Sequence, residues 1–271
     1  MPSIKDSKCI LIIGSTAGLG RALALSILAL PSKPTVIVCG RRQERLDELV
    51  EAHGTDGRLK GFKLDVLADR ASLKASVADV VQQYPGLDAV MFMSGIQHEY
   101  DFTEPESVDL DKVVDELNTN YLSVINMITF FLPHLIKVGK AGQPSFIYTV
   151  TSGLAVVPGP WVPNYCATKA ALHSLSLTLN AQLKDQNVHV VEILPPLVES
   201  ELHDHQGKRE VLSKIWMPLD EFTALTMQEL KSNDVQIPIG SSAKDYETFE
   251  TGKLDAVNKL YEGRKAATQR K

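Results

Sequence analysis

The sequence has little of several features that mark whole classes of protein. Its 271 residues include only three cysteines, with no C-x-x-C pair, so neither a disulfide framework nor a zinc site is expected. The net charge of −5 gives no basic excess of the kind that attracts nucleic acid or anionic lipid. Its longest apolar runs are far shorter than the roughly 20 residues that cross a bilayer. We therefore expect a soluble, cytoplasmic protein without a metal, a nucleic-acid partner or a membrane partner.

What is present indicates an α/β protein. The chain is 44% hydrophobic and 23% charged, close to globular averages, and its length suits one α/β domain. Short runs rich in β-branched and apolar residues alternate with segments of helical period up to about residue 200. The expected strands are 8–13, 35–39, 61–64, 87–93, 145–151, 188–194 and 235–239. This alternation predicts a doubly wound, Rossmann-like parallel sheet of about seven strands, with helices on both faces.

The pattern changes after position 200. A polar stretch with two histidines is followed by a helical run at 219–231, a short strand and a final helix near 244–264. No low-complexity linker separates these parts. We expect residues 1–271 to form one domain, in which residues 200–235 cap the substrate side.

A glycine-rich turn follows the first expected strand and opens the first helix. Gly14, Gly18 and Gly20 have the spacing G-x-x-x-G-x-G. Glycines there permit a tight turn and a close approach of the backbone to a pyrophosphate, while the helix N-terminus faces the phosphates. The pattern favours a dinucleotide site, although a plain strand-to-helix turn could also produce it. The residues expected to contact the nucleotide are Gly14, Ser15, Thr16, Gly18, Leu19 and Gly20.

Two arginines follow the second expected strand, where a site for NAD usually carries an acidic side chain. Arg41 and Arg42 come directly after Gly40. Because arginine forms bidentate, charge-assisted bonds to phosphate, this position favours the 2′-phosphate of NADP. The alternative is that both arginines are solvated at a helix start, and Glu44 could pair with either of them.

Three side chains later in the chain suggest proton transfer. Tyr165 and Lys169 are four residues apart in a segment with helical period, so they share one helix face. A nearby ammonium lowers the pKa of a phenol, which makes Tyr165 a candidate general acid for a carbonyl oxygen. Ser152 follows a buried strand, at the sheet edge where ligands bind, and its hydroxyl could hold the substrate oxygen.

These residues resemble the short-chain dehydrogenase/reductase family over about residues 5–200. The glycine turn, the separation of Ser152 from Tyr165, and the string Tyr-Cys-Ala-Thr-Lys ending at Lys169 stand in that family's order. The resemblance implies that Tyr165 is the acid or base, and that Ser152 orients the substrate carbonyl. It also implies that Lys169 lowers the pKa of Tyr165 and binds the nicotinamide ribose. Asn120 would hold a proton-relay water, with Asn118 the weaker candidate.

The resemblance implies further cofactor contacts. The sequence also departs from the family's pattern. The family's Asn-Asn-Ala-Gly after the fourth strand reads Phe92-Met93-Ser94-Gly95 here, and Pro196 replaces a glycine. Asp65 and Val66 match the family's pair at the adenine edge, and segment 195–200 matches the segment along the nicotinamide. The additional contacts expected are Asp65, Val66, Ser94, Gly95, Pro195, Val198 and Ser200, besides Tyr165 and Lys169.

The expected helix at 108–134 is apolar on more than one face. Such a helix needs burial beyond one sheet. In the family the corresponding helix and the tyrosine-bearing helix meet across a dimer axis. The resemblance therefore implies a homodimer or homotetramer.

The sequence as a whole predicts an NADP(H)-dependent oxidoreductase that interconverts a ketone or aldehyde and an alcohol. Hydride transfer would be accompanied by proton transfer at Tyr165, and a small, partly apolar substrate is expected. The alternative is a catalytically silent nucleotide-binding regulator or scaffold of the same fold, suggested by the altered segment 92–95. An epimerase or dehydratase acting on a sugar is a third hypothesis, which Arg41, Arg42 and the chain length disfavour.

Overall fold

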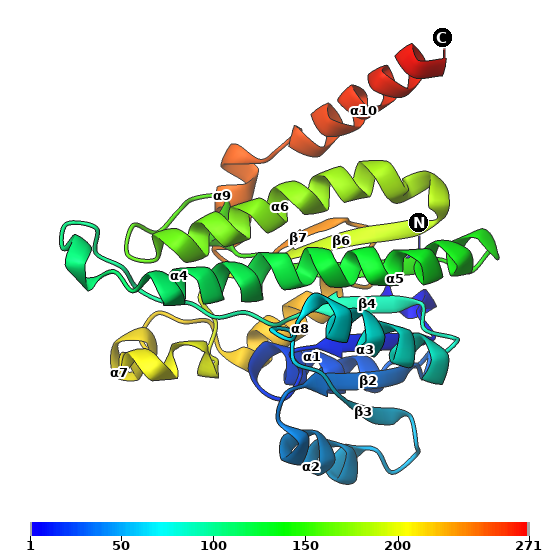
Figure 1. The fold of residues 1–271 in the computed structure, drawn as a ribbon, viewed down its shortest axis with the longest axis horizontal. Helices are drawn as coiled ribbons and strands as arrows, with labels where there is room; N and C mark the ends of the chain where they lie inside the picture. The colour runs from blue at the N-terminus through cyan, green and yellow to red at the C-terminus, as the bar shows by residue number, and fades with distance from the viewer. Residues whose placement is uncertain (1, 270–271) are drawn as a thin grey trace.

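A computed structural model describes residues 2–269. Within this range the chain forms a sheet of seven parallel strands in the order β3-β2-β1-β4-β5-β6-β7, with helices around it (Figure 1). The strands are β1 (Cys9–Ile13), β2 (Thr35–Gly40), β3 (Leu59–Lys63), β4 (Ala89–Phe92), β5 (Ser145–Val150), β6 (Val188–Leu194) and β7 (Gln236–Pro238). The doubly wound fold expected from the sequence is confirmed, including the seventh strand.

The central strands are buried because both faces of the sheet are covered. Every residue of β1, β4 and β5 is buried. Alternate residues of β1 enter different cores: Ile10 and Ile12 pack on one face, and Leu11 and Ile13 on the other. This follows from the two-residue period of a strand. It explains why these strands read as continuous apolar runs rather than alternating ones.

Two sets of helices cover the two faces of the sheet. Helices α1, α2 and α8 contribute to one core, and α3, α5 and α6 to the other. Helix α6 and the α4–α5 pair run side by side along one face (Figure 1). The helices are α1 (Gly18–Leu28), α2 (Gln43–His53), α3 (Arg70–Gln83), α4 (Leu110–Leu117), α5 (Ser123–Lys140), α6 (Pro163–Leu183), α7 (Arg209–Leu212), α8 (Leu219–Glu229), α9 (Ser242–Phe249) and α10 (Lys253–Gln269).

Helices α4 and α5 form one continuous helix joined by a π-helical turn at Asn118–Leu122. The combined helix, Leu110–Lys140, is long and apolar enough to cross a membrane by length and composition alone. Part of its surface is in the core, where Val124, Met127 and Phe131 pack against the sheet. A core helix of a soluble protein passes the same test.

The prediction of a single final helix at 244–264 is wrong. The structure has two helices there, α9 and α10, separated at residues 250–252. The break occurs at Gly252, whose φ of +83° lies outside the helical range, and Glu250 just before it is buried. Helix α10 lies beyond α6 in Figure 1 and is tied to the end of α6, where Glu262 pairs with Lys184 and Lys265 pairs with Asp185.

The turn between β1 and α1 packs tightly against the residue that follows the end of β4. Gly14 has φ of +90°, and a Cβ built there would lie 2.6 Å from the Ser94 nitrogen. The backbone N–H groups of Gly14 and Ser15 both donate to the Cys39 carbonyl, at 2.8 and 3.0 Å. The turn is therefore fixed by β2 and β4 together, and it has no room for a side chain.

We expect Gly14→Ala to destabilise the fold through two separable effects. The left-handed backbone costs an alanine about 1–2 kcal/mol, and overlap with Ser94 adds about 1–3 kcal/mol. Gly57→Ala is the matched control, because Gly57 also has positive φ (+75°) but has nothing within 4 Å of the added Cβ. Urea unfolding measures both variants. Equal losses in the two would show that the contact with Ser94 has no energetic weight.

Candidate functional site

Helix α6 presents Tyr165 and Lys169 on one face toward the sheet. Pro163 at the first position begins the helix, where a missing N–H costs nothing. Both side chains are buried, and the Lys169 ammonium lies 5.5 Å from the centroid of the Tyr165 ring. Lys169 Nζ donates to the Val150 carbonyl at 2.8 Å. One hydrogen bond therefore ties the middle of this helix face to the last residue of β5.

Ser152 lies just beyond the end of β5, as expected. It begins a short 3-10 turn, and its Oγ accepts from the Leu154 N–H at 3.1 Å. The next N–H, that of Gly153, donates to the Pro195 carbonyl at 2.9 Å. Because β5 and β6 are parallel neighbours, this bond joins two strand ends and holds Ser152 at the carboxyl edge of the sheet.

Asn120 reaches the same region from the π-helical turn. Its Oδ1 accepts from the Ile96 N–H, and its Nδ2 donates to the Ile96 carbonyl, both at 2.9 Å. Nδ2 also donates to Thr168 Oγ1 on α6, at 3.1 Å. A Cβ at Gly95 would lie 3.4 Å from Asn120 Oδ1 and 3.6 Å from Lys169 Nζ. The segment after β4, the π-turn and α6 therefore meet at one point.

Burial dominates the acid–base properties of this pair. The pKa of Lys169 is lowered to about 8 by burial, against the opposing charge of Glu116. Burial raises the pKa of Tyr165, which a hydrogen bond with Ser152 opposes and the charges of Cys166 and Glu116 reinforce. The lowering of the Tyr165 pKa by the Lys169 ammonium that the sequence predicts is not found in the protein alone, where burial raises the pKa of the phenol.

Glu116 is a buried carboxylate near the site that the sequence interpretation missed. Its side chain is fully buried; Oε1 accepts from the His98 N–H at 3.0 Å, and Oε2 accepts from Asn164 Nδ2 at 2.6 Å. Asn164 directly precedes Tyr165, so Glu116 links the segment after β4 to the start of α6. Burial raises the pKa of Glu116, while these bonds and Lys169 lower it. The available signal was weak: Glu116 stands one helical turn before Asn120, but Asp111 and Asp115 are carboxylates on the same helix.

The predicted nucleotide side of the site consists of the glycine turn, the start of α2 and the segment after β6. Arg42 Nη2 donates to Thr16 Oγ1 at 2.8 Å. Arg42 and Arg45 both pair with Glu201, at 3.5 and 3.0 Å. Thus Glu201, rather than Glu44, is the carboxylate next to Arg42, and Arg45 is a further basic residue that the sequence interpretation did not include. Arg41 is exposed.

Several other predicted contacts border this region with their side chains already engaged. Ser15 Oγ is buried, donates to the Ile12 carbonyl at 2.7 Å and accepts from the Cys39 N–H at 2.8 Å. Asp65 is exposed and accepts from the Leu67 N–H at 3.0 Å. Ser200 caps the turn Glu201–Gln206. Of the remaining residues, Leu19 and Val66 pack at the two cores, and Pro195 and Val198 are buried. Ser94 and Gly20 contact Gly14, and Gly18 faces Ser200.

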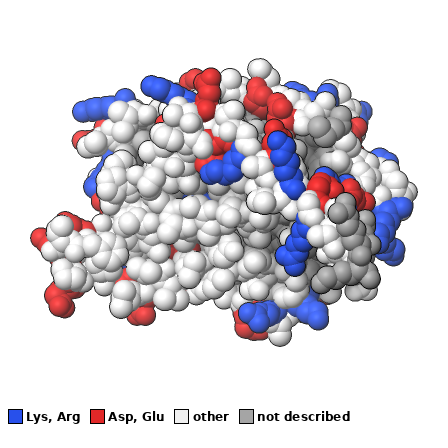
Figure 2. Space-filling model, turned by 90° about the horizontal axis from the view of Figure 1, so that it is seen from above, with Lys and Arg blue, Asp and Glu red and all other residues white. Residues whose placement is uncertain are grey.

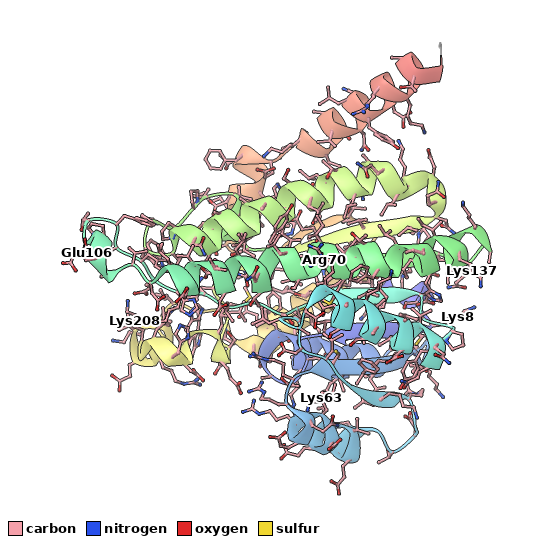
Figure 3. The ribbon with its side chains drawn as sticks, viewed as in Figure 1. Lys8, Lys63, Arg70, Glu106, Lys137 and Lys208 are labelled. Atoms are coloured by element: carbon pink, nitrogen blue, oxygen red, sulfur yellow. The ribbon has the colours of Figure 1, made fainter. Side chains whose placement is uncertain are left out.

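The segment after β6 lies against the segment after β4. The rings of His98 and His205 are 5.3 Å apart, and Lys208, labelled in Figure 3, pairs with Glu99. Trp161, between Ser152 and Tyr165 in sequence, is 57% exposed. The neighbouring Val162 is fully buried and packs with Tyr165 and Cys166.

We expect Glu116→Gln to lower the pKa of Lys169 below its value of about 8, because the variant removes the negative charge that favours the ammonium. NMR of lysine labelled at Cε would follow this titration. Asp115→Asn is the control: Asp115 is the neighbouring carboxylate and is exposed. An unchanged Lys169 titration in Glu116→Gln, or an equal shift in both variants, would contradict the assignment.

Comparisons with known proteins identify the family and the fold. The family model described as short chain dehydrogenase matches residues 8–211. The chain is 36% identical over 229 residues to the uncharacterized oxidoreductase DltE of Bacillus subtilis (strain 168), covering 84% of this chain and 86% of that protein. Its fold is similar to that of 3-ketoacyl-(acyl-carrier-protein) reductase from Brucella melitensis complexed with NADH (TM-score 0.74, 21% identity, 86% and 96% of the two chains). It is also similar to the Pseudomonas aeruginosa RhlG/NADP active-site complex (TM-score 0.75, 21% identity, 88% and 98%). The chain belongs to the short-chain dehydrogenase family.

Proposed function

We propose that this short-chain dehydrogenase is an NADP(H)-dependent enzyme that interconverts a ketone or aldehyde and an alcohol, with Tyr165 as the general acid or base. The observation that carries the proposal is the meeting of four side chains at the carboxyl edge of the sheet. Lys169 contacts the end of β5 and the Tyr165 ring, Ser152 follows that strand, and Asn120 contacts the same helix. A purely nucleotide-binding protein would have no need for all four.

The residues at the glycine turn fit a dinucleotide. Helix α1 begins after Ala17, which has no side-chain oxygen to accept from the first-turn N–H groups. Those donors, together with the helix dipole, favour a phosphate group. Gly18 faces Ser200, and a Cβ at Gly18 would lie 3.5 Å from Ser200 Cβ. The absence of side chains at Gly14, Gly18 and Gly20 therefore supports a close backbone approach to a pyrophosphate.

The protein side chains handle the proton at the substrate oxygen. When bound, the nicotinamide supplies or accepts the hydride at the neighbouring carbon. Tyr165, whose pKa is raised by burial, donates its proton to the oxygen during reduction. Ser152 orients that oxygen, and the Lys169 ammonium, whose pKa lies near 8, stabilises the resulting phenolate and can return a proton to it. Asn120 fixes the position of Lys169 by holding Ile96 and Thr168.

The arginines at the start of α2 support NADP over NAD. Arg41 is exposed, and Arg42 lies between Thr16 and Glu201. Both are near the place where the adenosine ribose lies in this fold family, and no acidic residue stands at the end of β2. Asp65 and Val66 remain the expected adenine contacts, and Ser94, Gly95, Pro195, Val198 and Ser200 the expected contacts toward the nicotinamide.

The substrate side is covered by residues 200–235 in our proposal, which makes this segment part of a single domain rather than a separate one. The substrate is a small carbonyl compound or alcohol.

Apolar side chains on α4, including Leu110, Val114 and Leu117, are exposed, and uncharged side chains cover the middle of the face seen in Figure 2. This supports a homodimer or homotetramer that buries α4 and α6. We place the protein in the cytoplasm, because its three cysteines are free thiols.

We expect Tyr165→Phe to lower turnover of a carbonyl substrate by about 10²- to 10⁴-fold, as loss of a general acid does, with NADPH affinity little changed. NADPH oxidation at 340 nm against a panel of aldehydes and ketones measures turnover, and nicotinamide fluorescence measures binding. Tyr261→Phe, on α10, is the control and should keep full activity. Wild-type protein that binds NADPH but turns over no member of the panel would favour a nucleotide-binding regulator.

We expect wild-type protein to bind NADPH more tightly than NADH. Arg41→Ala and Arg42→Ala should each weaken NADPH binding by about tenfold or more, the value of a charge-assisted hydrogen bond, without affecting NADH. Glu201→Gln should tighten NADPH binding, because it removes a carboxylate that competes with the 2′-phosphate for Arg42. Arg264→Ala, on α10, is the control. Equal affinity of the wild type for the two nucleotides would overturn the NADP assignment.

A further inference from the structure

A second cluster of ionisable side chains lies in the core, and the proposed chemistry does not use it. His173 on α6, Glu192 on β6 and Glu250 after α9 are 5%, 1% and 5% exposed. The three come from elements far apart in sequence. Charged groups are rarely buried so completely without a role or a full set of partners.

The geometry indicates that His173 is a cation. Its Nδ1 lies 2.8 and 3.0 Å from the two carboxylate oxygens of Glu192, and its Nε2 lies 3.0 Å from Glu250 Oε2. An ionised carboxylate only accepts hydrogen bonds, so both ring nitrogens must donate, which requires the imidazolium. Burial alone would lower the pKa of His173, but the bonds to Glu192 and Glu250 outweigh it and raise the pKa.

The charges of this network are balanced within it. Lys253 on α10 pairs with Glu250 Oε1, so two carboxylates face two cations. Tyr246 on α9 is a further titratable group nearby, and it donates to Gln236 on β7 at 2.9 Å. Burial raises the pKa of Tyr246, as do the charges of Asp234 and Asp255, so its phenol is neutral. Gln236 in turn donates to Glu192 Oε2 at 3.1 Å.

The network is directly connected to the end of β5. Thr151 Oγ1 donates to Glu192 Oε1 at 2.6 Å, and Thr151 is the residue before Ser152. Tyr165, Lys169 and His173 occur at every fourth position of α6 and therefore share one face. Two successive connections thus join the end of β5 to this helix face. The first is the hydrogen bond from Lys169 to Val150, and the second runs from His173 through Glu192 to Thr151.

The network also fixes the chain after residue 241 against the site. Ser242, at the start of α9, lies so close to Gly153 that a side chain at Gly153 would overlap it. Glu250, at the other end of α9, is held by His173. Both ends of this helix are therefore attached to elements that carry proposed active-site residues, one beside Ser152 and one on α6.

We propose that His173, Glu192 and Glu250 are positioning residues that hold Ser152 in register with Tyr165 and Lys169, and that they make the segment after residue 241 a working part of the active site. The inference rests on the proposed function for its kinetic consequence, but its structural part stands without it. Removing one partner of a buried ion cluster destabilises a protein whatever the cluster does, so a loss of stability would not distinguish positioning residues from merely structural ones. The test therefore needs readouts other than stability.

The charge on His173 is tested first. ¹⁵N NMR of the imidazole should show both ring nitrogens protonated at pH 7, and one deprotonated in Glu192→Gln or Glu250→Gln. Because the folded-state pKa is raised above its ordinary value, the stabilising effect of this group is present at low pH and is lost as the pH rises through the folded-state pKa. A neutral His173 ring in the wild type at pH 7 would overturn the inference.

The positioning effect is tested by hydrogen exchange and kinetics together. Glu250→Gln and His173→Gln should speed amide exchange in peptides covering Thr151–Val157, and should lower kcat by about 10- to 100-fold, the effect of a small displacement of reacting groups, with KM little changed. Glu247→Gln, an exposed carboxylate on α9, is the matched control and should change neither.

The outcomes separate the two proposals. Faster exchange at 151–157 with an inactive wild type would sustain the positioning network and reject the proposed reaction. Unchanged exchange and unchanged kcat in a folded Glu250→Gln protein would reject the network, whatever the wild type catalyses. A parallel loss in Glu247→Gln would also reject it, because that residue lies outside the buried cluster.

Discussion

The parallel direction of every strand is the constraint on which the rest of the molecule depends. Parallel strands all end at one edge, so the segments after β1, β4, β5 and β6 must meet there, however far apart they are in sequence. Gly14, Ser94, Ser152 and Pro195 each follow one of these strands. Their mutual contacts, such as Gly14 with Ser94 and Gly153 with Pro195, are the direct result. The proposed sites for the nucleotide and the substrate therefore share this edge.

Buried charge is the second theme, and it is concentrated on the faces of two helices. Lys169 and Glu116 lie near the phenol, and His173 lies one turn farther along α6 between two carboxylates. Each buried charge lowers stability unless it is paired and hydrogen-bonded. All three side chains are hydrogen-bonded: Lys169 donates to a strand carbonyl, Glu116 accepts twice, and His173 donates on both sides. His173 is also paired with two carboxylates. Such groups fix relative positions more strictly than apolar contacts, because misplacement leaves them unpaired.

The sequence predicted what depends on local pattern. The strands are visible in the sequence as apolar runs, and the helix start at Pro163 is visible as a proline before a segment of helical period. The glycine turn is visible from the spacing of its three glycines. Residues that matter through distant pairing could not be found in this way. Glu116, Arg45 with Glu201, and the His173 network each join segments at least 19 residues apart, and nothing in their neighbouring residues records the partner. The break before α10, in contrast, has a local signal that the sequence interpretation missed: Gly252 has a φ of +83°, and glycine is common just past the end of a helix.

The π-helical turn at Asn118–Leu122 has a consequence for how this chain can change length. Each residue of an α-helix advances the side chains by about 100° around the axis, whereas a π-turn closes its hydrogen bonds one residue later. Glu116 before the turn and Phe131 after it both face inward. The wider turn allows these two side chains and that of Asn120 to be buried at the same time. Deleting one residue here would restore a regular helix and rotate one of these faces into solvent. Surface loops can gain and lose residues freely, but the residue count of this turn is fixed.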